Sequence, residues 1–133
     1  MLFRSSPLIT LFLAAKLYAN AAHHRATGPT FFEDHEWLGE AYAAYDAAFD
    51  GLAERAIGLG EQVDHVAIYR EAVALQSSNY DAAFASLLKL ETMIQDAIAT
   101  ASKGASIGTQ NLLAQLADDS EARVYKLRQK LAA

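Results

Sequence analysis

Residues 23–35 read HHRATGPTFFEDH, and this stretch separates two long helical patterns by a tight turn. Gly28-Pro29 stops the first pattern, because proline cannot continue a helix and glycine accepts turn conformations. Thr30 followed by Glu33 is typical of a capping box, which predicts that the next helix begins at residue 31. The turn would bring the end of the first helix close to the start of the second.

Helical periodicity continues on both sides of this turn, because apolar residues recur at intervals of three and four positions. No strand-like alternation or internal repeat competes with it. Long helices are expected over about 7–25, 31–57, 79–103 and from about 109 onward, with a short amphipathic helix inside the 61–78 connection. A long connection is typical of a bundle with a crossover. We therefore predict an all-α four-helix bundle, with the short extra helix between the second and third long helices, as a single domain over residues 1–133.

The first 22 residues, MLFRSSPLITLFLAAKLYANAA, have two interpretations. One basic residue, an apolar run and a small-residue end resemble a signal peptide. Ser6 as an N-cap and Pro7 in the first helical position instead predict a helix, which we prefer because Lys16 interrupts the apolar run. The run is too short to span a bilayer, so we expect no membrane insertion.

Composition excludes several classes of function. The chain has no cysteine, so disulfides and thiolate metal sites cannot form. Its net charge of −5 and pI of about 5.2 argue against a generally basic surface that binds nucleic acid.

Four side chains suggest a metal site that one chain cannot complete. His35 and Asp50 lie fifteen positions apart on the second helix, which is roughly 22 Å along the helix axis. Two such helices packed antiparallel about a twofold axis would place His35 of one copy beside Asp50 and Glu54 of the other, and His23 would fold back near His35. Two imidazoles and two carboxylates suit Fe(II) or Mn(II) and also accept Zn(II). The alternative is that the carboxylates are ordinary surface groups with Arg55 as a partner, and that the histidines are polar ends beside a turn.

The stretch 23–35, together with FDGLAER at 49–55 and GTQNLLAQLADDSEARVYKLRQKL at 108–131, resembles the Dps miniferritins. The resemblance implies a ferritin-like subunit, assembly into a hollow cytoplasmic dodecamer, and defence against oxidative stress. It also implies that Fe(II) is oxidised, preferentially with hydrogen peroxide, and stored as ferric iron. Alignment of the motif places the family's metal ligands, which meet across a twofold interface, on the four residues selected by spacing: His23, His35, Asp50 and Glu54.

The chain departs from the family pattern near the proposed site. His24 stands where the family usually has an aromatic residue, and Gly39 stands where some members have an acidic one. His24 and Glu36 are therefore accessory metal candidates, with a plain polar replacement as the alternative for His24. Three acidic residues of the last helix would line the family's iron-entry pore or, equally, form a solvated face: Asp118, Asp119 and Glu121.

These observations predict a ferroxidase with iron as its substrate. One alternative is a structural or interaction bundle that has lost efficient catalysis. Another is a DNA-protecting protein without a basic tail, which the negative charge disfavours, so we expect no appreciable DNA binding.

Overall fold

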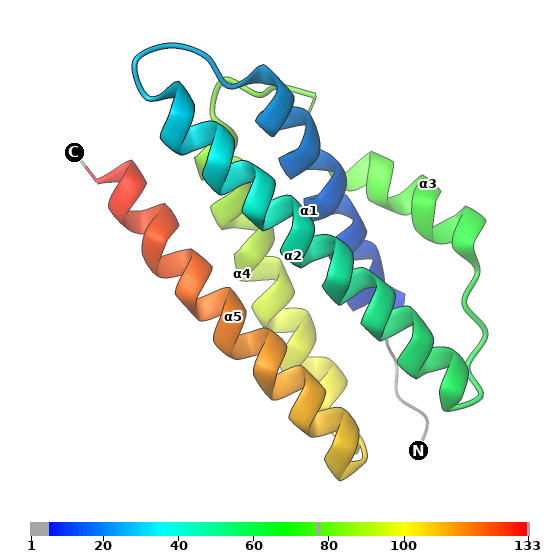
Figure 1. Cartoon of the computed structure of the whole chain (residues 1–133). Coiled ribbons are helices and arrows are strands. Elements are labelled where there is room, and N and C mark those ends of the chain that lie inside the picture. The colour runs from blue at the N-terminus through cyan, green and yellow to red at the C-terminus, as the bar shows by residue number, and fades with distance from the viewer. Residues whose placement is uncertain (1–5, 77, 133) are drawn as a thin grey trace.

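The computed structural model describes residues 6–76 and 78–132, and five helices form this part of the chain (Figure 1). Four of them make a bundle: α1 (Ser6–Arg25), α2 (Phe31–Gly58), α4 (Ala83–Ser102) and α5 (Ile107–Leu131). The short α3 (His65–Leu75) lies against α1, in the connection between α2 and α4. The predicted four-helix bundle with an extra short helix is confirmed. In the described ranges, no helix is both long and apolar enough to cross a membrane.

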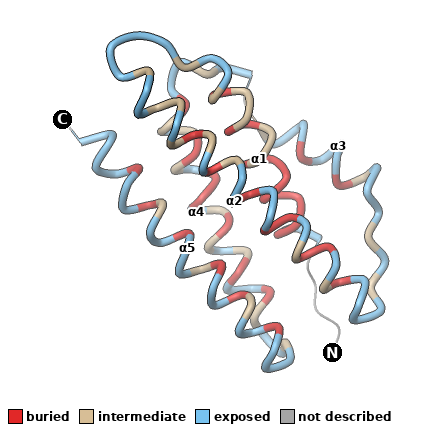
Figure 2. The backbone as a smooth tube through the Cα atoms, in the orientation of Figure 1, coloured by how far each residue is buried: buried red, intermediate tan, exposed pale blue. Residues whose placement is uncertain are grey.

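Helix α1 is the most deeply buried element. It contacts α2, α3 and α4, and every residue from Leu8 to Ala15 is buried. Burial all round a helix requires neighbours on several sides, which explains why this segment reads as a nearly continuous apolar run. Lys16 ends the run, and its ammonium lies 2.9 Å from the Asp46 carboxylate on α2. The helix expected over about 7–25 is therefore confirmed, although Ser6, expected as its N-cap, is already the first residue of α1. Figure 2 shows buried residues in all four long helices.

The ends of two helices differ from the sequence-based expectation. The predicted capping box at Thr30 is wrong, because the Thr30 side chain accepts no backbone N–H and its hydroxyl donates instead to Asp34 at 2.7 Å. The third long helix begins at Ala83 rather than at residue 79. Asn79 accepts the backbone N–H of Asp81 at 2.9 Å, and this local turn competes with helical hydrogen bonding.

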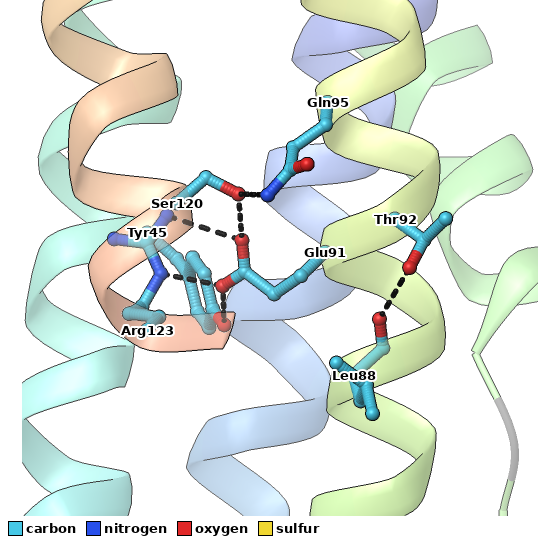
Figure 3. A network of polar contacts seen from close by, with 7 residues as sticks. All are labelled: Tyr45, Leu88, Glu91, Thr92, Gln95, Ser120 and Arg123. Atoms are coloured by element: carbon cyan, nitrogen blue, oxygen red, sulfur yellow. Dashed lines mark hydrogen bonds and ion pairs between the residues drawn. The ribbon is translucent and has the colours of Figure 1, made fainter. Parts of the chain in front are cut away.

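A buried polar network joins α2, α4 and α5 inside the bundle (Figure 3). The Glu91 carboxylate is fully buried, accepts the Tyr45 hydroxyl at 2.5 Å and the Ser120 hydroxyl at 2.7 Å, and forms an ion pair with Arg123. A buried charge requires such partners, because an unpaired carboxylate in the interior is strongly destabilising. Sequence analysis missed this network, since its members are far apart in the chain and follow no motif.

Candidate metal centre

The structure brings His23 and His35 into direct contact across the turn between α1 and α2. His23 belongs to the last turn of α1, and His35 lies one turn into α2. Their rings stack with centroids 3.8 Å apart and planes 16° from parallel. The turn that joins the helices contains Gly28 with a φ of 90°, a left-handed conformation that favours glycine.

Each imidazole is anchored by the backbone of the other histidine. His23 Nδ1 lies 2.6 Å from the His35 carbonyl oxygen, and His35 Nδ1 lies 2.9 Å from the His23 carbonyl oxygen. A carbonyl can only accept, so Nδ1 must carry the proton and donate in both rings. The Nε2 atom of each neutral ring is then the nitrogen with a free lone pair. Hydrogen bonding at one ring nitrogen while the other remains available is the usual arrangement of a metal-binding histidine.

Two further residues hold this pair, and sequence analysis assigned neither of them that role. The Phe31 ring stacks on His35 with centroids 4.9 Å apart. Gly39 adjoins His23, since a Cβ atom built on Gly39 would lie 2.9 Å from His23 Cε1. The signal that could have found both is their spacing, because each is four positions from His35 and so shares its face of α2.

The two carboxylates lie on a distant part of the same helix. Asp50 and Glu54 are exposed, one turn apart, toward the end of α2. Because α2 is continuous, the fifteen residues from His35 to Asp50 span roughly 22 Å along the axis. Accordingly, the residues that the structure describes contain no group of three or more histidine or acidic side chains able to hold a metal. Arg55, the partner that the surface-carboxylate alternative gave to these residues, donates to the Thr109 hydroxyl at 3.4 Å.

The accessory metal candidates, His24 and Glu36, are both exposed beside the histidine pair in sequence. His24 is exposed, and its ring centroid lies 5.6 Å from that of His23. Glu36 is exposed on α2, directly after His35. Both reach solvent, so a partner subunit or a metal ion would have access to them.

The three candidate pore residues are all exposed on α5. Asp118 and Glu121 face solvent, and Asp119 accepts the Gln115 amide at 3.0 Å. The pore hypothesis and the solvated-face alternative both require these three residues to be exposed.

Comparison with protein families identifies a ferritin-like domain. The model of the ferritin-like domain matches residues 8–133, which includes all five helices apart from the first two residues of α1. No curated protein sequence matches the chain.

Proposed function

Because the chain belongs to the ferritin-like domain family, we propose that it binds Fe(II), oxidises it and stores the ferric product in the manner of a Dps-type miniferritin. The observation that carries this proposal is the reciprocal anchoring of His23 and His35. Each ring uses Nδ1 in a hydrogen bond to a carbonyl and keeps Nε2 for an ion, so the subunit offers two nitrogen ligands.

A second copy of the chain supplies the oxygen ligands in this proposal. Two α2 helices packed antiparallel, with the twofold axis between residues 42 and 43, set His35 of each copy opposite Asp50 of the other. Ala43 and Ala44 are exposed near that axis and leave room for close approach. Ala41 does not belong to this surface, because its side chain is buried in the core.

The proposed reaction is balanced by two Fe(II) ions for each hydrogen peroxide. Each Fe(II) gives up one electron, the O–O bond breaks, and two protons from solvent convert both oxygen atoms to water. Two-electron reduction of peroxide releases no hydroxyl radical. His23 and His35 of one subunit bind the ions together with Asp50 and Glu54 of the other, and no resident cofactor is required.

The proposed assembly is a hollow homo-oligomer of twofold dimers, a dodecamer as in the miniferritins. The acidic residues of α5, Asp118, Asp119 and Glu121, would attract Fe(II) at its entry points. A net charge of −5 on each subunit repels phosphate, so DNA binding is not part of the proposal.

Replacing Asp50 by alanine tests the proposal. Fe(II) is added anaerobically, hydrogen peroxide follows, and the ferric product is measured optically. We expect wild type to oxidise iron rapidly and keep it soluble, and Asp50→Ala to fall close to the rate of buffer, because one metal ligand is gone. Circular dichroism should be unchanged, since Asp50 is exposed in the subunit, and native mass establishes that the variant still assembles.

Asp96→Ala is the matched control, because Asp96 is an exposed aspartate on α4. It should oxidise iron like wild type. Unchanged kinetics in Asp50→Ala would remove the site assignment. A wild-type protein no faster than buffer would favour the alternative, a helical bundle without ferroxidase activity.

A further inference from the structure

Gly39 lies where the imidazole of His23 meets α2. The Cβ atom of any other residue at this position would lie 2.9 Å from His23 Cε1 and 3.1 Å from His23 Nδ1. The first distance is shorter than real Cβ contacts and the second is tighter than most of them, so the ring would have to move. The ring itself belongs to a partly buried side chain that is stacked on His35 and hydrogen-bonded to the backbone.

Helix geometry explains why this conflict arises at residue 39. His23 Nδ1 donates to the carbonyl of His35, and in an α-helix the N–H of residue 39 points at that same carbonyl. Every Cα–Cβ bond in a helix tilts toward the N-terminus, so a side chain at 39 would lean over the turn that contains the His35 carbonyl. The imidazole and a side chain at 39 therefore compete for one volume.

We propose that Gly39 is the positioning residue for His23: the missing side chain allows both imidazoles to be held at once, so that the subunit offers two nitrogen ligands. The inference rests on the proposed function in taking His23 as a metal ligand. It adds a selectivity, because a half-site with two imidazoles favours imidazole-preferring divalent ions over ions that prefer carboxylate oxygens.

The opposite side of the pair is arranged differently. His35 has Phe31 stacked on it, and its Nδ1 is held by the last turn of α1. A substitution at Gly39 should therefore displace His23 and leave His35 in place. The expected defect is the loss of one nitrogen ligand rather than the collapse of the site.

The experiment measures Co(II) binding by calorimetry and visible absorption in Gly39→Ala, with Gly58→Ala as the matched control. Gly58 also lies on α2, and a Cβ built there meets nothing within 4 Å. Gly39→Ala raises helix propensity in the interior of α2, and Gly58→Ala raises it less because Gly58 is the last residue of that helix. We expect Gly39→Ala to weaken Co(II) binding by at least about tenfold, the loss typical when the support of a metal ligand is removed, and Gly58→Ala to match wild type.

A double-mutant cycle tests whether Gly39→Ala weakens Co(II) binding through the His23 ring. In a His23→Ala background the ring is gone, so Gly39→Ala should leave Co(II) affinity unchanged and raise the Tm through helix propensity. The same loss of affinity in both backgrounds, or none in the wild-type background, would overturn the inference. If Gly39→Ala alone fails to fold, a folded double variant still demonstrates the conflict with the ring, whereas an unfolded double variant overturns it.

These readouts are independent of iron oxidation. A protein that binds Co(II) through His23 but does not oxidise Fe(II) would remove the proposed function and retain the role of Gly39. Co(II) binding that is unaffected by His23→Ala would overturn this inference, while the Asp50→Ala kinetics would still decide the proposed function.

Discussion

At the scale of single residues, Tyr45 shows how the bundle holds a charge in its interior. Its hydroxyl donates to the fully buried Glu91, and the Arg123 guanidinium lies 4.8 Å from the centroid of its ring. Burial raises the pKa of the Tyr45 phenol well above its usual value of 10.0, and the Glu91 charge acts in the same direction. The folded protein therefore keeps this phenol protonated in a pH range where the unfolded chain ionises it.

This difference predicts a loss of stability in alkaline solution. Because the folded pKa is raised, the contribution of Tyr45 is complete below the unfolded pKa and declines as pH rises toward the folded pKa. The decline should reach about 1.4 kcal/mol by roughly pH 11. Tyr45→Phe should be less stable than wild type near neutrality, and the gap should narrow by about that amount at high pH.

The difference in free energy of unfolding between wild type and Tyr45→Phe is measured by urea unfolding near neutrality and at high pH. Unfolding is followed by circular dichroism at a fixed protein concentration. Tyr125→Phe is the control, because Tyr125 is 64% exposed. It removes a phenol that is exposed in the folded protein, and so controls for the Tyr→Phe change itself. A gap for Tyr45→Phe that stays constant would show that the phenol ionises equally in both states.

The candidate site was partly predictable from its residues. Spacing and chain reversal were enough to expect His23 beside His35, and the structure confirms that contact. Spacing also sets Gly39 and Phe31 on the face of α2 that carries His35, but their role as supports follows only from the direction in which each ring lies. The role of Asp50 and Glu54 stays a prediction, since it depends on a second copy of the chain.

At the scale of helices, periodicity located the elements and local hydrogen bonds decided their ends. The bounds of α2 were predicted to within one residue, because a glycine-proline turn and a pair of glycines bracket it. The start of α5 was missed by two residues, since Ser106 caps it by accepting the Thr109 N–H at 3.3 Å. Thr30 has the residue type of a cap but not the backbone conformation, with φ −104° and ψ 22°.

The two helix starts give a matched prediction. Ser106→Ala should destabilise the protein by about 1 kcal/mol, because the Thr109 N–H loses its acceptor. Thr30→Ala should cost only a few tenths of that amount, roughly the value of an exposed hydrogen bond between side chains. The urea midpoints of unfolding of both variants show whether Ser106→Ala loses more stability than Thr30→Ala. An equal loss in the two variants would mean that the Thr30 hydroxyl caps α2 in solution.

At the scale of the whole molecule, the rigidity of α2 separates the two halves of the proposed site. The helix runs unbroken from Phe31 to Gly58, so its histidine end and its acidic end cannot fold back onto each other. Lys16 and Asp46 further tie its middle to α1. A site that uses both ends must therefore lie between two copies, and this requirement can be tested by mixing variants.

Subunits carrying His35→Ala and subunits carrying Asp50→Ala should each be inactive alone and regain activity when unfolded and refolded together. In a mixed dimer, one site combines both defects and the other combines an intact histidine pair with intact carboxylates. Random pairing makes about half of the dimers mixed, so roughly a quarter of the wild-type oxidation rate should return. Co-refolding His35→Ala with His23→Ala is the control, because neither subunit supplies an intact pair. Recovery limited to the first mixture would establish a shared site. No recovery in a mixture shown by native mass to contain mixed dimers would mean that His35 and Asp50 do not act on the same ion.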